Sequence, residues 1–394
     1  GNGIETKPAE QFFSGEMALV EAVDQLFGPP PLHRHGRIMV TIPGEAARSP
    51  ALLLDLAQRG MDIARINCAH DTPEIWRELA EQLRLVGEKV GRPVPILMDI
   101  AGPKIRTEAV EHAEDHKKLQ MGEAFRLVAS GRPRLSDDIP VSASVSLPQI
   151  VTHLAVGDRL RYDDGKLEGY VETTLENEAI VRVTKTKAGG TKIKPEKGLN
   201  LPDTDLGLSP LTAKDEADLA TVLECADMIG YSFIRRPHDI ELLEQAIARI
   251  APGRARPGLI AKIEQPEAVA NLPQLIARAR PGWRFGVMIA RGDLASEIGF
   301  ERLAEMQEEI LWICEAASVP AIWATQVLEN LVKDGIPSRG EMTDAAIAAR
   351  AECVMLNKGP AIRDGVMLLD RLLTRMEGHM LKKTPILRAL KAWS

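Results

Sequence analysis

The chain has 394 residues, enough for two or three domains. Its 45% hydrophobic and 27% charged residues are typical of a globular protein, and a net charge of -7 argues against nucleic acid as a partner. No apolar stretch approaches the ~20 residues of a membrane span, and the first residues lack the features of a signal peptide. Because the sequence opens on Gly-Asn-Gly without an initiator methionine, we expect a piece of a longer protein.

The cysteines lie far apart and show no metal-ligand spacing. They are Cys68, Cys225, Cys314 and Cys353. Each lies in or beside an apolar run, so we expect buried free thiols in a reducing compartment, consistent with a cytoplasmic protein.

Residues 1–36 are predicted to form a leader with a helix near Glu16 to Phe27. Pro29 to Pro31 cannot donate backbone hydrogen bonds, so the segment after this helix is expected to be a linker or a clasp against the next domain. His33 and His35 alternate as strand residues do, but a metal site with no third ligand nearby is only a weak alternative.

From Arg37 onward, short apolar runs alternate with amphipathic segments of helical length, the signature of repeated βα units. The predicted strands begin at Arg37, Asp62, Val94, Asp227, Leu259, Phe285, Pro320 and Glu352. Eight such units favour a closed (β/α)8 TIM barrel over an open Rossmann sheet, because no glycine-rich GxGxxG turn follows the first strand.

The connection between Asp99 and Asp227 is too long for a barrel loop. Its residues alternate between apolar and polar around turn signals, which predicts β-hairpins. We therefore expect the first part of the barrel at 37–106, an inserted β domain at 107–202 after the third strand, and the second part of the barrel with a C-terminal tail at 203–394. One more helix, Ala361 to Glu377, is predicted after the eighth strand.

Polar residues gather at the carboxyl ends of the predicted strands, where barrel enzymes hold their catalytic groups. They are Arg65, Asn67, Asp99, Ser232, Lys262, Glu264, Asp293, Thr325, Asn357 and Lys358. Lys262 and Glu264 are two positions apart, so both are predicted to point into the barrel mouth. A structural ion pair is the alternative, but its desolvation has a cost that partners or function must offset.

Glu264 and Asp293 follow adjacent predicted strands, so their carboxylates can converge on one hard cation. The turn at Gly292 is predicted to expose amide groups that bind a carboxylate or phosphate, and Arg65 and Arg106 add positive charge. A divalent cation, arginines, a lysine and amides together indicate phosphoryl transfer or enolate stabilisation. Salt-bridged strand ends remain the alternative.

These segments also resemble pyruvate kinases, in order, from Arg37 to about Glu377. RINCAH resembles the family's RLNFSH, MDIAGPKIRT resembles LDTKGPEIRT, and YDDG and KGLNLP match two motifs of the inserted domain. IGYSFIR resembles ALSFVR, IAKIEQPEAV resembles IAKIENQEGV, IARGDLASEI resembles VARGDLGVEI, WATQVLENL resembles TATQMLDSM, and PSRGEMTDAA resembles PTRAEVSDVA. The resemblance implies a TIM barrel with an inserted β-barrel-like domain and without the family's C-terminal effector domain.

The resemblance also implies roles for single residues. Catalytic residues would be Lys262, which meets the transferring phosphoryl group, Arg65, which holds the phosphate, and Thr325 beside the enolate carbon. Mg²⁺ (or Mn²⁺) would be bound by Glu264 and Asp293, and phosphoenolpyruvate or pyruvate by Gly292, Asp293, Ser232 and Arg106. The nucleotide would be bound by Thr41, His70, Asp164 and Lys197.

The chain departs from the family on the nucleotide side, where SGETA becomes NKGP at Asn357 to Pro360 and TIGPAS becomes TIPGEA. At the family's K⁺ site the corresponding positions are Asn67, Ala69, Asp99 and Ile100, so one hydroxyl ligand is absent. The family's GPEIR is GPKIR here, and Lys104 would supply the charge of the ion. We therefore expect that K⁺ is not required. The alternative is that Lys104 only pairs with Asp99 or another carboxylate.

The first hypothesis is a phosphotransferase that uses phosphoenolpyruvate, pyruvate and a nucleotide; the family likeness also allows a homo-oligomer. A second is a Mg²⁺-enolate lyase or aldolase acting on a 2-oxo acid, and a third is a regulatory homologue with altered catalysis. Lys262 favours the first over the second, because an aldolase needs no lysine aimed at a phosphate. The paired carboxylates argue against the third.

Overall fold

A computed structural model of the chain describes residues 14–204 and 206–380. The structure divides into two compact units. The first comprises residues up to 102, 210–291 and from 304 onward, and the second comprises 103–209 together with 292–303. The predicted helix near Glu16 lies in the first unit, whereas the start of the predicted leader, residues 1–13, is outside the described residues.

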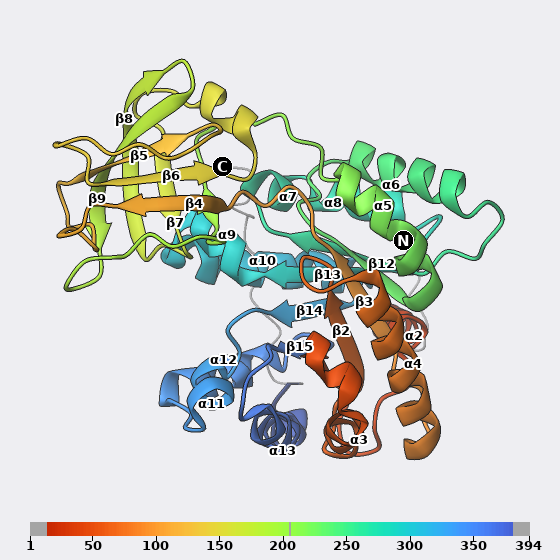
Figure 1. Ribbon diagram of the computed structural model, residues 1–394. Coiled ribbons are helices and arrows are strands. Elements are labelled where there is room, and N and C mark those ends of the chain that lie inside the picture. The colour runs from red at the N-terminus through yellow and green to blue at the C-terminus, as the bar shows by residue number, and fades with distance from the viewer. Residues whose placement is uncertain (1–13, 205, 381–394) are drawn as a thin grey trace, which may run out of the picture. The chain divides into compact units, whose positions relative to one another are not determined.

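The first unit contains a barrel of parallel strands (Figure 1). The barrel is closed, with the strands in the order β1-β15-β14-β13-β12-β11-β3-β2, which confirms the predicted fold. The strands are β1 (Arg37–Thr41), β2 (Ile63–Asn67), β3 (Ile96–Ile100), β11 (Met228–Tyr231), β12 (Gly258–Ile263), β13 (Phe285–Ala290), β14 (Ala321–Ala324) and β15 (Cys353–Leu356). Each is buried along nearly its whole length, because helices cover the outside and side chains fill the inside.

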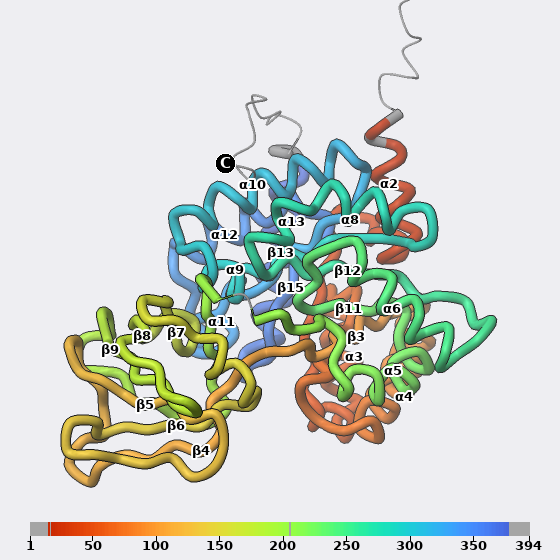
Figure 2. The backbone as a smooth tube through the Cα atoms, turned by 90° about the horizontal axis from the view of Figure 1, so that it is seen from above, coloured from red at the N-terminus to blue at the C-terminus, as the bar shows by residue number. Residues whose placement is uncertain are grey.

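Helices surround the barrel (Figure 2). They are α3 (Pro50–Gln58), α4 (Pro73–Val90), α5 (Ala213–Cys225), α6 (Pro237–Ile250), α7 (Pro266–Ala270), α8 (Leu272–Ala279), α10 (Phe300–Ala316), α11 (Glu329–Asp334), α12 (Arg339–Ala348) and α13 (Ile362–Met380), with the short 3-10 helix η1 (Gly44–Arg48). Helix α4 illustrates how the sequence determines these helices. Pro73 is its first residue, Leu79 and Leu83 lie on its buried face, and Gly91 ends it in a left-handed conformation with φ 70°.

The inside of the barrel has an apolar layer and a polar layer, separated by the two-residue period of the strands. The apolar layer contains Met39, Ile63, Leu97, Met228, Ile260, Met288, Ile322 and Cys353, all at most 1% exposed. Residues two positions further along these strands include Thr41, Arg65, Asp99 and Lys262. One period thus places a hydrophobic core at one level and a charged cluster at the next.

Helix α2 (Ser14–Phe27) packs against the apolar layer through Val23, Leu26 and Phe27, each at most 3% exposed. The segment that follows contacts α13, where His33 Nε2 lies 2.9 Å from Asp370 Oδ1 and His35 pairs with Glu377. Arg34, only 2% exposed, contacts Asp370 and Asp62 at 2.8 and 2.7 Å. The two histidines therefore face carboxylates, and no group of three metal-ligating side chains occurs in the described part of the chain.

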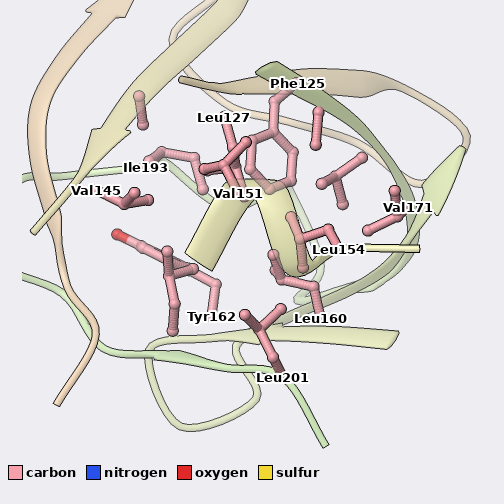
Figure 3. Packing of buried hydrophobic residues seen from close by; sticks show 14 of the residues in the cluster. Phe125, Leu127, Val145, Val151, Leu154, Leu160, Tyr162, Val171, Ile193 and Leu201 are labelled. Carbon is pink, nitrogen blue, oxygen red and sulfur yellow. The ribbon is translucent and has the colours of Figure 1, made fainter. Parts of the chain in front are cut away.

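The second unit is built on a seven-stranded sheet in the order β10-β7-β8-β9-β5-β6-β4. Its strands are β4 (Thr107–His112), β5 (Ala124–Val128), β6 (Val141–Val145), β7 (Arg159–Tyr162), β8 (Leu167–Leu175), β9 (Glu178–Thr186) and β10 (Leu199–Asn200), with the 3-10 helix η2 (Pro148–His153). Figure 3 shows its core, where Phe125, Leu127, Leu160 and Tyr162 are buried together. Helix α9 (Arg291–Ile298) belongs to this unit from Gly292 onward.

All four cysteines are free and buried, as the sequence predicted. Burial raises the pKa of the thiols of Cys68, Cys314 and Cys353, so they remain protonated. Across the described residues, no helix is both long and apolar enough to cross a membrane.

Candidate active site

Lys262 is the centre of a buried polar cluster inside the barrel. Its Nζ lies 2.9 Å from Glu264 Oε1, 3.7 Å from Asp99 Oδ2, and donates to Ser232 Oγ at 2.7 Å. Burial works against the charge, but Asp99 and Glu264 outweigh it and raise the pKa of the Lys262 amine. The lysine is therefore a fixed cation with a defined direction.

Asp99 joins this lysine to Arg65. Arg65 Nε donates to Asp99 Oδ2 at 2.6 Å, and Arg65 Nη1 donates to Thr41 Oγ1 at 2.9 Å. Burial would raise the pKa of the Asp99 carboxyl, but Arg65 and Lys262 hold it below its usual range. Two cations and two carboxylates, including Glu264, thus balance one another in a space where each is at most 9% exposed.

The backbone around this cluster leaves room for it. A side chain at Gly230, the neighbour of Asp99 in β11, would place its Cβ 1.7 Å from Asp99 Oδ1. Phe233 has φ 57°, and this left-handed conformation accompanies a 2.6 Å hydrogen bond from its amide to Glu264 Oε2.

Ser232 donates to the carbonyl of Ile100 at 2.7 Å while it accepts from Lys262. Ser232, predicted to bind substrate, is therefore in direct contact with the lysine.

A small cavity of about 150 Å³ opens beside Arg65 at the ends of β1, β2 and β15. Its lining includes four predicted site residues, Thr41, Arg65, Asn67 and His70, together with Asn357 and Lys358. The structure therefore brings the predicted nucleotide side of the barrel together with the segment in which this chain departs from the family pattern. Asn67 Oδ1 accepts from the amide of Ala69 at 3.1 Å, so its oxygen is used within the loop.

Several of the other predicted residues lie in the second unit, with Asp293 in the first turn of α9. They are Lys104, Arg106, Asp164, Lys197, Gly292 and Asp293. Lys104 Nζ contacts Asp293 Oδ1 at 2.7 Å and Oδ2 at 3.0 Å. Asp164 has its pKa raised by burial and by Asp293, against the opposing effect of Lys104. Lys104 thus pairs with a carboxylate, as the alternative reading of the sequence allowed. Asp293 was not predicted as the partner, because the sequence does not indicate which carboxylate a lysine will meet.

The remaining residues of that unit have local partners. Lys197 Nζ lies 3.5 Å from Asp163 Oδ1, next to Asp164 in the YDDG turn. Arg106 Nη1 donates to the carbonyl of Glu196 at 3.1 Å. Gly292 is part of the first turn of α9 rather than of a separate turn, and amides there have no acceptor within a helix.

Thr325 follows β14 in a loop that the sequence did not predict in detail. It has φ 73°, and Gln326 and Leu328 also have positive φ, at 59° and 49°. The guanidinium of Arg291 donates to the carbonyls of Ala324 and Thr325 at 3.0 and 2.6 Å. The sequence reasoning missed Arg291, although its place beside the predicted Gly292 and Asp293 is a signal that could have found it.

The predicted metal carboxylates have the chemistry of a site for a hard cation. Glu264 faces the ammonium of Lys262, and Asp293 faces that of Lys104, so each carboxylate already attracts positive charge. No set of three His, Cys, Asp or Glu side chains suited to a metal occurs among residues 14–204 and 206–380. Glu264 belongs to the first unit and Asp293 to the second, and their joint role as metal ligands stays a prediction.

Comparison with known proteins identifies the family. The model of the pyruvate kinase barrel domain matches residues 33–363. The chain belongs to the pyruvate kinase family. It is 33% identical over 334 residues to the pyruvate kinase of Methylorubrum extorquens and 31% identical over 348 residues to that of Mycobacterium intracellulare. A third relative, the pyruvate kinase of Geobacillus stearothermophilus, is 33% identical over 323 residues.

The alignments cover most of this chain but less of the relatives. They include 84%, 88% and 80% of this chain, and 65%, 70% and 51% of the three pyruvate kinases in the same order. The first of these relatives is thus matched over less than two thirds of its length, and the second over slightly more. The family likeness covers both the barrel and the inserted β domain.

Proposed function

We propose that the chain catalyses Mg²⁺-dependent phosphoryl transfer between phosphoenolpyruvate and a nucleoside diphosphate, giving pyruvate and a nucleoside triphosphate. The observation that carries the proposal is the buried cation pair of Lys262 and Arg65, both held by Asp99. Fixed cations in a site of low dielectric stabilise charge on a transferring phosphoryl group without reorganisation at the moment of reaction.

Each group has a task in this proposal. Lys262 meets the phosphoryl group as it leaves the enol oxygen, and Arg65 holds the phosphate. The amides of Gly292 and Asp293 bind the carboxylate of the substrate, with Ser232 and Arg106 as further substrate contacts. Thr325 lies beside the methylene carbon to which the proton is delivered.

Glu264 and Asp293 would hold the Mg²⁺, or Mn²⁺, which would neutralise charge on the phosphoryl and enolate oxygens. Thr41, His70, Asp164 and Lys197 would bind the nucleotide. The cavity beside Arg65 supports this assignment for Thr41 and His70, because Lys358 adds a further cation to the same wall.

The test is an assay of pyruvate formation from phosphoenolpyruvate, with a panel of nucleoside diphosphates and with none. Formation that requires one of the diphosphates, with a matching yield of triphosphate, supports the proposal. Formation of pyruvate and inorganic phosphate without any nucleotide would be hydrolysis, with water as the acceptor, and would contradict the proposal. Cleavage of a 2-oxo acid in the same preparation supports the lyase hypothesis instead. Isotope-labelled phosphoenolpyruvate identifies the molecule that receives the phosphoryl group.

A further inference from the structure

Arg291 has an unusually complete set of partners for a residue at the end of a strand. It follows β13 directly, and its side chain is only 11% exposed. The guanidinium contacts Asp344 in α12 through two nitrogens, at 2.5 and 2.9 Å, and lies 4.7 Å from the ring centroid of Trp323. The two-nitrogen contact with Asp344 and the stacking on Trp323 together fix the plane of the guanidinium.

That fixed plane directs the remaining N–H groups at the loop after β14. Nε donates to the carbonyl of Ala324 at 3.0 Å, and Nη2 donates to that of Thr325 at 2.6 Å. Arg291 therefore holds two consecutive peptide groups, one at the end of the strand and one in the loop. A lysine could carry the charge, but it could not form this set of contacts.

The loop needs such support because its backbone is strained. Thr325, Gln326 and Leu328 all adopt positive φ, a conformation that side chains with a Cβ disfavour. Val327 and Leu328 are buried at 2% and 0% exposure, which anchors one end of the loop. Arg291 anchors the other end, at the residue assigned to proton delivery.

We infer that Arg291 is a positioning residue that fixes Thr325 through its carbonyl, with Asp344 and Trp323 orienting the guanidinium. The inference rests on the proposed function for the role of Thr325. It predicts that loss of Arg291 impairs delivery of the proton to the enolate carbon more than it impairs phosphoryl transfer. A merely structural ion pair would lower both steps together.

The experiment compares Arg291→Met and Arg291→Lys with the control Arg350→Met. Arg350 forms a similarly half-buried ion pair with Glu308, with side chains 20% and 29% exposed, and no proposed site residue takes part in it. Hydrogen exchange followed by mass spectrometry reports on the peptide covering residues 322–328. We expect faster exchange there in both Arg291 variants and parent-like exchange in the control.

Two partial reactions are then measured in the same variants. Formation of nucleoside triphosphate from phosphoenolpyruvate reports phosphoryl transfer, and exchange of the methyl protons of pyruvate in deuterium oxide, followed by NMR, reports the proton step. We expect the proton step of Arg291→Met to fall by about tenfold or more relative to phosphoryl transfer. Adding Thr325→Ala to it should give little further loss, because both act through one group.

Three outcomes would overturn the inference: unchanged hydrogen exchange at 322–328, an equal fall of both partial reactions, or full recovery of both by Arg291→Lys. If the parent shows neither partial reaction, the proposed function fails. The exchange measurement still decides whether Arg291 fixes the loop, because it requires no turnover.

Discussion

Glu352 accepts a hydrogen bond from the amide of Ala321 at 2.7 Å, which joins the start of β15 to the start of β14. Burial raises the pKa of this carboxyl to about 7, against the lowering effect of the Ala321 amide. The folded protein therefore binds a proton at pH 5 to 6 that the unfolded chain has largely released. By linkage, the stability of the fold falls as pH rises from about 4.5 to 7.

We predict that Glu352→Gln, which retains an acceptor for Ala321, removes this pH dependence. Between pH 5 and pH 8 the parent should lose about 1–3 kcal/mol of unfolding free energy more than the variant. Urea unfolding at both pH values measures the difference. Glu301→Gln, a change in an exposed carboxylate, is the control. Identical pH profiles of Glu352→Gln and the parent would contradict the prediction.

Asp99→Asn tests the second buried carboxylate, whose pKa is shifted in the opposite direction. Burial opposes its charge, but Arg65 and Lys262 lower the pKa of Asp99, so its contribution to stability is present above the usual carboxyl range and is lost as pH falls below it. Removing the Asp99 charge, which leaves Arg65 and Lys262 without this partner, should lower the free energy of unfolding by about 3–5 kcal/mol at pH 7. Denaturation at pH 7 and below about pH 3 should show the difference between variant and parent shrinking toward acid, because the contribution is lost only below the ordinary carboxyl pKa. A difference that grows would refute the assigned charge.

Lys262→Met keeps the apolar stem and removes the cation from between Asp99 and Glu264. Phosphoryl transfer should fall by about 10²–10³-fold or more. The variant should also be less stable, because two buried carboxylates lose a partner. Turnover and thermal unfolding are measured beside Lys214→Met, whose lysine is 55% exposed; turnover within a few-fold of the parent would make Lys262 structural.

The sequence could predict the barrel and this cluster because both follow from local periods. The two-residue period of β12 places Lys262 and Glu264 on one face, and the structure confirms it with a distance of 2.9 Å. The partners of Lys104 and Arg291 could not be predicted in this way. Lys104 meets Asp293 across 189 positions, and Arg291 meets Asp344 across 53, so only the folded chain determines which charges meet.

The metal carboxylates are tested by binding of oxalate, a mimic of the pyruvate enolate. Glu264→Ala and Asp293→Ala should each abolish Mg²⁺-dependent oxalate binding, because two carboxylates provide most of the protein's share of the metal shell. Calorimetry with and without Mg²⁺ measures the affinity for oxalate. Glu224→Ala, which breaks an exposed ion pair with Arg77, is the control. Unchanged affinity in both variants would remove this metal site.

The last prediction concerns K⁺. In the barrel, the groups that correspond to three of the family's K⁺ ligands already have partners, although Asp99 Oδ1 has no hydrogen-bond partner among the described residues. Asn67 Oδ1 accepts from the amide of Ala69, the carbonyl of Ile100 accepts from Ser232, and Asp99 binds Arg65. We therefore predict that phosphoryl transfer in tetramethylammonium buffer does not change when K⁺ is added.

Lys104→Glu should make the reaction dependent on K⁺. The substitution deletes the ammonium that Asp293 contacts at 2.7 and 3.0 Å and adds a carboxylate, so the unit loses a cation and gains an anion. Two like charges about 4 Å apart repel by about 1 kcal/mol even in water, and an added monovalent cation relieves that repulsion. Lys166→Glu, next to Asp163 in the same unit, is the matched control. Strong stimulation of the parent by K⁺ would show that Lys104 does not stand in for the ion, because the parent would then still need one.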